Sequence, residues 1–192
     1  MLDDAINLLP QSKVAKLVKG RLNTSLLRPD ATAKGRLLAA VREFRESSLR
    51  RDYYEGFNVN SKNCMQKSKG TQTWLAECER LFDRCVNEAG RRTPGEVRRA
   101  LDILFDLLRL IDHDPDRVIF FADEGGSYEV GVDWAEVLPA WFKCLSATSS
   151  PDEYATHAVA AIDEFVEYHR KKYLPIARKL ATPEQRRALP KK

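Results

Sequence analysis

The chain has 192 residues, of which 43% are hydrophobic and 31% are charged, and its formal net charge is +4. A chain of this length can bury about 70% of its unfolded surface around one core, and its composition excludes a largely disordered chain. No apolar run approaches the roughly 20 residues that cross a bilayer, and the N-terminal residues lack the pattern of a signal peptide. We therefore expect one helical domain over residues 1–192, cytoplasmic and without membrane contact.

Charge is distributed unevenly along the chain. Residues 1–72 contain 14 Lys and Arg against 7 Asp and Glu, residues 73–168 contain 9 against 20, and residues 169–192 contain 9 against 1. Such blocks can attract partners of either sign, or they can pair with one another when the chain folds. The sequence leaves both outcomes open.

The N-terminal third is predicted to be helical up to a polar loop. Residues 1–29 hold short amphipathic helices, of which 12–22 carries lysines opposite an apolar stripe. Residues 30–57 show the spacing of one long helix, with Gly56 as its stop signal. Residues 58–70 are polar, include three asparagines and follow neither the helical nor the strand period, which predicts a loop.

Residues 71–111 are predicted to form a helical hairpin whose second helix is the centre of the fold. That helix begins at Thr93, because Pro94 suits the first helical position and Glu96 can complete a capping box with Thr93. Its apolar residues recur at three- and four-residue spacing, so it must be covered on more than one side. The inward positions are Val97, Ala100, Leu101, Leu104, Phe105, Leu108 and Ile111.

Residues 112–133 form an acidic insertion between this hairpin and the next. Residues 118–122 are apolar and rich in β-formers, and Gly125 with Gly126 can form a tight turn. We therefore expect either a small β-hairpin at about 118–132 or an ordered loop whose phenylalanines reach the core.

Residues 134–173 are predicted to form a second helical hairpin, and residues 174–192 a basic C-terminal segment. The two hairpins match in sequence, because the first helix of each carries a tryptophan near its start and the second helix of each opens with a hydroxyl-Pro-x-Glu signal. Their inward faces also agree in phase. Over residues 74–170 this pattern resembles HEAT-type helical repeats, which implies a short α-solenoid, and an irregular helical bundle is the alternative.

The four cysteines show neither a metal-site nor a disulfide pattern. Cys64, Cys78, Cys85 and Cys144 include no C-x-x-C pair, and the chain has neither the small size nor the signal segment of a secreted disulfide scaffold. We expect reduced and mostly buried thiols.

No reactive set of residues converges in the sequence. The aspartates from Asp112 to Asp123 are spaced like those of a calcium loop, but Arg117 stands where that loop needs glycine and Asp123 where it needs glutamate. The three histidines are dispersed, and no hydrolase or phosphate-binding motif is present. We therefore expect no catalytic residue, no metal site and no cofactor.

These observations favour a non-catalytic helical interaction module that binds another protein through its segregated charged surfaces. A nucleic-acid-associated protein that uses the basic N- and C-terminal segments is the first alternative, and a metal-dependent regulator or enzyme built on the acidic insertion is the second. The candidate partner-binding residues lie in the basic loop and in the acidic insertion: Arg50, Arg51, Tyr54, Lys62, Lys67, Lys69, Asp123, Glu124, Tyr128 and Glu129.

Overall fold

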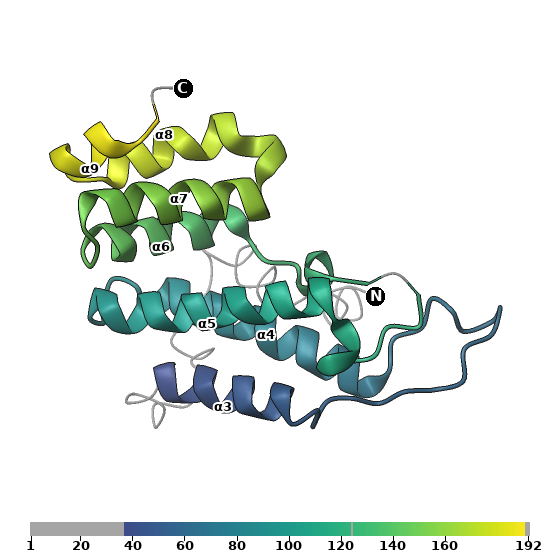
Figure 1. Cartoon of the computed structure of the whole chain (residues 1–192). Helices are drawn as coiled ribbons and strands as arrows, with labels where there is room; N and C mark the ends of the chain where they lie inside the picture. The colour runs from purple at the N-terminus through teal and green to yellow at the C-terminus, as the bar shows by residue number, and fades with distance from the viewer. Residues whose placement is uncertain (1–36, 124, 191–192) are drawn as a thin grey trace, which may run out of the picture. The chain divides into compact units, whose positions relative to one another are not determined.

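A computed structural model describes residues 37–123 and 125–190, and the regular structure in these ranges is helical apart from one isolated bridge (Figure 1). The prediction of an all-α fold is confirmed for this part of the chain. The helices predicted within residues 1–29 lie outside the described residues. No helix in the described ranges has the length and apolar character needed to cross a bilayer.

The α-helices are α3 (Leu37–Leu49), α4 (Lys69–Glu88), α5 (Pro94–His113), α6 (Trp134–Ser146), α7 (Pro151–Phe165), α8 (Arg170–Leu180) and α9 (Pro183–Ala188), and the 3-10 helices are η3 (Pro115–Arg117), η4 (Ser127–Val130) and η5 (Glu167–His169).

The helices of residues 37–190 pack in successive layers. α4 and α5 lie side by side, and α3 packs against α5. α6 contacts both α5 and α4, α7 returns beside α6, and α8 and α9 pack against α6 and α7 (Figure 1). α5 therefore has neighbours on more than one side, as its apolar sequence requires.

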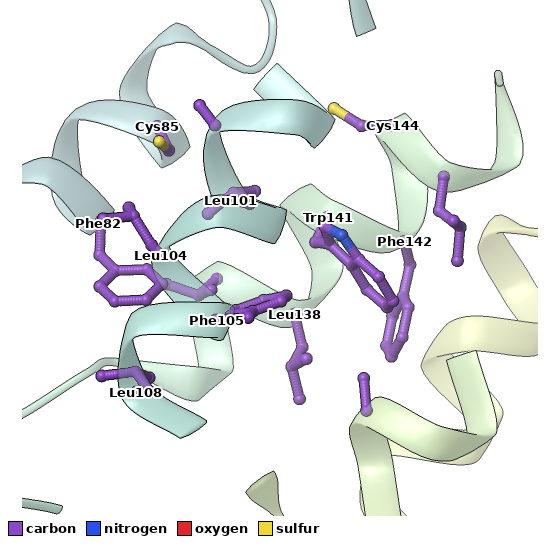
Figure 2. Close-up of a cluster of buried hydrophobic side chains, with 14 of the residues drawn as sticks. Phe82, Cys85, Leu101, Leu104, Phe105, Leu108, Leu138, Trp141, Phe142 and Cys144 are labelled. Carbon is purple, nitrogen blue, oxygen red and sulfur yellow. The ribbon is translucent and has the colours of Figure 1, made fainter. Parts of the chain in front are cut away.

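The core position of α5 is confirmed, because all seven of its predicted inward residues are buried. Phe105 is the centre of an aromatic cluster that joins four helices, α4 to α7. Figure 2 shows it between Phe82 of α4 and Trp141 of α6. Its ring centroid lies 5.5 Å from that of Trp141 on α6 and 5.1 Å from that of Phe165 on α7. Trp134 stacks on Phe165 with centroids 4.8 Å apart. These rings hold the two hairpins together by dispersion and by burial of a large apolar area.

α3 ends at Leu49, so the predicted helical boundary near Gly56 was wrong. The hydroxyl of Ser48 donates to the carbonyl of Phe44 at 2.7 Å and accepts from the indole N–H of Trp74 at 2.8 Å, which fixes the last turn against α4. Arg51 then adopts a left-handed backbone with φ of 64°. A residue in this conformation ends a helix and reverses the chain, and it is usually glycine. Because the residue at this position is an arginine, the sequence gave no signal that the helix ends here.

α7 also ends earlier than predicted, at Phe165 instead of near Tyr173. Val166 leaves the helix with φ of −143° while its side chain remains buried, so the core holds the chain in a turn at this point. A new helix, α8, starts at Arg170 and runs across the predicted boundary at residues 173–174, with Pro175 inside it. Pro175 is exposed, so water can solvate the carbonyl that its missing N–H leaves unbonded.

Only one of the two matching helix starts forms its capping box. At α7 the hydroxyl of Ser150 accepts from the N–H of Glu153 at 3.4 Å, and the carboxylate of Glu153 accepts from the N–H of Ser150 at 3.0 Å. At α5 the side chain of Thr93 makes no capping bond. Glu96 is instead bound by Arg92 at 3.4 Å, so the predicted box at Thr93 was wrong.

The described residues of the 118–132 segment form no β-hairpin. Phe121 pairs with Lys67 in an isolated antiparallel bridge, and the second half of the segment folds into η4. Val118 and Ile119 are fully buried, and the N–H of Ser127 donates to the carboxylate of Asp112 at 2.6 Å. The segment fits the alternative of an ordered loop, because its backbone bonds to a distant loop in place of its own return strand.

The cysteines are free thiols, and their burial predicts selective reactivity. Burial raises the pKa of Cys85 to about 12 and that of Cys78 well above its ordinary value, while Cys64 lies half-buried in the loop before α4. Because the thiolate is the reactive form, a disulfide reagent such as DTNB should titrate only Cys64 in the native protein and all four thiols after denaturation. Cys64→Ser should abolish the native reaction. Rapid reaction of DTNB with a second thiol of the native protein would contradict the burial described here.

Candidate interaction surface

The loop between α3 and α4 is held in shape by its asparagines. The side-chain oxygen of Asn63 accepts from the N–H of Asn60 at 2.7 Å, and its amide nitrogen donates to the carbonyl of Asn58 at 2.9 Å. The side-chain oxygen of Asn60 accepts from the N–H of Lys62 at 2.9 Å. Such side-chain bonds to the backbone replace the ladder bonds that an irregular segment lacks. The predicted loop is therefore ordered by local chemistry.

The structure brings this loop and the acidic insertion together. Besides the backbone bridge of Lys67 with Phe121, the ammonium of Lys67 donates to the carboxylate of Glu129 at 2.5 Å. The hydroxyl of Thr71 donates to the carbonyl of Phe120 at 2.6 Å. We call residues 50–69, 118–123 and 125–130 together the loop–insertion surface. Both segments that the sequence singled out as partner-binding candidates belong to it.

Aromatic side chains fill the contact between the two segments. Phe120 meets the rings of Tyr54 and Phe57 edge to face, with centroids 6.0 and 5.1 Å away. The guanidinium of Arg51 lies 3.8 Å from the centroid of the Tyr54 ring, which is within cation–π range. This packing gives the surface a rigid base.

At the base of the loop, the backbone at Gly70 lies close to the backbone at Tyr53. The N–H of Gly70 donates to the carboxylate of Glu55 at 2.9 Å, and the hydroxyl of Ser68 accepts from the N–H of Thr71 at 3.0 Å. A Cβ at Gly70 would lie 2.1 Å from the carbonyl oxygen of Tyr53. Glycine is therefore required here for the loop to return to α4.

The predicted site residues differ in exposure and in pairing in the structure. Lys67 and Glu129 bind each other, and Tyr54 is half-buried in the aromatic contact. Arg50 is exposed and bound to Asp52 at 2.8 Å. The remaining described candidates are exposed, and Glu124 lies outside the described residues. The exposed candidates are Arg51, Lys62, Lys69, Asp123 and Tyr128.

Sequence reasoning missed two exposed apolar residues of the same surface. The side chain of Met65 is 83% exposed and that of Val59 is 46% exposed. Both stand among polar residues without any period, so no pattern in the sequence indicates on which side they lie. Their position follows only from the asparagine turns that shape the loop.

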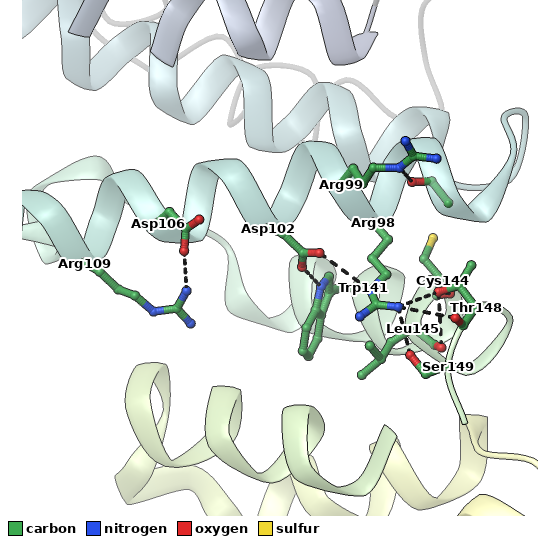
Figure 3. A network of polar contacts seen from close by, with 11 residues as sticks. Arg98, Arg99, Asp102, Asp106, Arg109, Trp141, Cys144, Leu145, Thr148 and Ser149 are labelled. Atoms are coloured by element: carbon green, nitrogen blue, oxygen red, sulfur yellow. Dashed lines mark hydrogen bonds and ion pairs between the residues drawn. The ribbon is translucent and has the colours of Figure 1, made fainter. Parts of the chain in front are cut away.

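A polar seam between α5 and the α6–α7 turn is fully paired (Figure 3). Arg98 donates to the hydroxyls of Ser149 and Thr148 at 2.9 and 3.1 Å, and the indole N–H of Trp141 donates to Asp102 at 2.8 Å. Burial raises the pKa of Asp102, against the hydrogen bond from Trp141 and the charge of Arg98, which lower it. Since these groups bind one another, the seam joins the hairpins.

Two open grooves have volumes of about 350 and 500 Å³, and the first is lined by charges of both signs from α3 and α5. Within the described ranges no three His, Cys, Asp or Glu side chains gather to hold a metal ion. The residues lining the first groove are Arg42, Arg45, Glu46, Ile103 and Asp106.

Comparison with protein-family models, with curated proteins and with solved structures gave no match to this chain.

Proposed function

We propose that this chain is a non-catalytic interaction module that binds another protein through the loop–insertion surface. The supporting observation is which segments carry the exposed apolar side chains. Five large apolar side chains are exposed within residues 37–123 and 125–190, and Val59, Met65 and Tyr128 all lie on this surface. Tyrosine and methionine are enriched at the centres of protein interfaces, because they bury much area on contact.

The charges of the surface narrow the chemistry of the partner. Lys67 and Glu129 neutralise each other, so they support the surface and are not assigned to partner binding. Lys62 forms no ion pair with another described residue, and Arg51 is exposed over the Tyr54 ring. A matching partner has an apolar cleft for Met65 and Tyr128 with carboxylates at its border. The small apolar area suits a transient complex.

The stack of hairpins supplies the rigid support for this surface. We propose that α4–α5 and α6–α7 are two units of a short HEAT-like array, because each hairpin buries the face of its neighbour. The contacts of Phe105 with Trp141 and Phe165 support this proposal. The loop–insertion surface is then a set of inter-helix loops of the array, which is where repeat proteins carry binding residues.

The test is site-specific photocrosslinking followed by titration. A benzoylphenylalanine placed at Met65 should crosslink a protein in cells of the native host, and the same group at Tyr168 should not. The captured protein is then purified and titrated with the chain. Met65→Asp combined with Tyr128→Ala should weaken that binding about 30-fold or more, the loss expected from removing an interface hot spot.

Tyr168→Ala is the matched control, because Tyr168 is 94% exposed and lies outside the loop–insertion surface. It should leave the affinity unchanged. A partner that binds the double variant as tightly as the original chain, or that crosslinks equally from Tyr168, would refute the proposed surface. Circular dichroism of each variant checks that the fold is intact.

A further inference from the structure

The outer faces of α8 and α9 form a second charged surface that the proposed function does not use. Residues 166–190 contain seven Lys and Arg against two Glu. Some of these cations have structural roles: Arg170 pairs with Asp163, and Arg178 and Arg186 donate to backbone carbonyls. Four others are exposed and form no ion pair with another described residue. These four are Lys171, Lys172, Lys179 and Arg187.

The lysines of α8 share one side of the helix. At 100° per residue, Lys171, Lys172 and Lys179 fall within an arc of about 100°, opposite the buried Ala177. The ammonium of Lys172 also lies 5.1 Å from the centroid of the Tyr173 ring. Lys171 and Lys179 are about 12 Å apart along the axis, a length over which one strand in stacked, B-form geometry carries about three or four phosphates. The cations are therefore arranged as a row at a spacing that phosphates can follow.

Helix stability does not account for Lys171 and Lys172. They stand in the first turn of α8, which contains no acidic residue, and a cation at this end is disfavoured by the helix dipole. Lys179, in the last turn, is favoured by the same dipole. The two N-terminal lysines thus raise the positive potential at the end of α8 where an exposed aromatic side chain also lies.

That aromatic side chain is Tyr168, which is 94% exposed in η5, three residues before Lys171. An aromatic ring in water next to exposed cations is the combination that binds single-stranded nucleic acid, since cations follow phosphates and the ring stacks on an unpaired base. A duplex offers phosphates but no free base face. The ring therefore favours a single strand over a duplex.

We propose that Tyr168, Lys171, Lys172, Lys179 and Arg187 form a binding surface for single-stranded nucleic acid. An anionic membrane is disfavoured, because no Leu, Ile, Val, Phe or Trp is exposed among the described residues 167–190 that could insert into lipid. An acidic protein would use the cations but would gain little from Tyr168. Glu167 and Glu184 are the acids on these elements, and they leave the surface strongly positive.

Fluorescence anisotropy of the full chain with labelled oligo(dT) and oligo(rU) of about 12 nucleotides, within the range of single-strand sites, tests the proposal. With four phosphate contacts, the plot of log affinity against log salt should have a slope of about −3, and Lys171→Gln with Lys172→Gln should halve it. The same double variant should weaken binding about tenfold or more at low salt. Tyr168→Ala should weaken it about 5- to 100-fold, the cost of one lost stacking contact.

Arg42→Gln with Arg45→Gln is the matched control, since it removes the same charge from exposed positions of α3. It should reduce the affinity for the oligonucleotides by no more than two- to threefold, as a general charge effect would. Three results would each overturn the proposal: no binding at low salt, equal losses from the two double variants, or a Tyr168→Ala variant that binds like the original chain. Tighter binding to anionic vesicles or to polyglutamate than to either oligonucleotide would also overturn it.

Discussion

Phe105→Ala is expected to lower the free energy of unfolding by about 3–5 kcal/mol, the range for removing a phenylalanine from a packed core. Phe105 is 1% exposed and touches four aromatic rings from three other helices. Those rings are fixed by their own contacts, so the site cannot collapse fully around alanine and a cavity remains. Urea unfolding followed by far-ultraviolet circular dichroism measures the change, since it does not depend on the tryptophans beside the cavity.

Two substitutions bracket this result. Phe105→Leu keeps most of the volume and should cost about 1–2 kcal/mol, whereas Tyr168→Ala at an exposed position should change stability by less than about 0.5 kcal/mol. A loss below about 1.5 kcal/mol for Phe105→Ala would mean that the cluster is loosely packed and that α5 is not the centre of the fold.

Helix faces were predictable because the helical period places residues three and four apart on the same side. Leu104, Phe105 and Ile162 are buried for this reason, and the hydroxyl-Pro-x-Glu signal located the start of α7 correctly. The same reasoning failed at Thr93, where Arg92 competes for Glu96. A local signal is realised only when no neighbour offers its members a better partner.

Helix ends depended on contacts between residues far apart in the sequence. α3 stops at Leu49 because Ser48 bonds to Trp74, 26 residues later, and no local glycine or proline marks that point. The β-hairpin, one of the two structures expected for residues 118–132, is absent from the described residues for a related reason, since Phe121 pairs with Lys67 instead of with its own segment. Such pairings have no signature in the periodicity of either partner.

The candidate surface was half predictable. Composition located the basic loop and the acidic insertion as unusual, but it did not reveal that Lys67 and Glu129, 62 residues apart, bind each other. Lys67 and Glu129 were both proposed to contact a partner, and in the structure they bind each other. The sequence also gave no reason to select Met65, whose 83% exposure is a property of the folded loop alone.

The two proposed surfaces can be tested independently, because they use different elements. The loop–insertion surface depends on Met65 and Tyr128, whereas the basic surface depends on Tyr168 and the lysines of α8. Each aromatic substitution is therefore the control for the other. If the partner protein is itself bound to nucleic acid, Tyr128→Ala should weaken protein binding at constant oligonucleotide affinity.

Gln185→Ala is the second substitution with a large expected effect, about 2–4 kcal/mol of lost stability, because it leaves several buried polar groups without partners. Gln185 is 2% exposed. Its amide nitrogen donates to the carbonyls of Ser146 and Ser149 at 3.0 and 3.1 Å, and its oxygen accepts from the Ser146 hydroxyl at 2.7 Å and from the N–H of Thr182 at 2.9 Å. One side chain thus ties α9 to the turn between α6 and α7. Thr182→Ala removes only the helix cap and should cost about 1 kcal/mol.

Gln185→Glu distinguishes the hydrogen bonds that Gln185 accepts from those that it donates. It therefore tests whether the donated bonds contribute to stability. A glutamate keeps both acceptor contacts but, when ionised, faces the carbonyls of Ser146 and Ser149 without a proton to donate. Burial and these carbonyls should raise its pKa in the folded state, so the stability it retains is present at low pH and is lost as pH rises through that raised value. Melting temperatures of the variant and the original chain, compared between pH 5 and 8, measure the difference. A gap between the two proteins that stays constant over this range would contradict the hydrogen bonding assigned to Gln185.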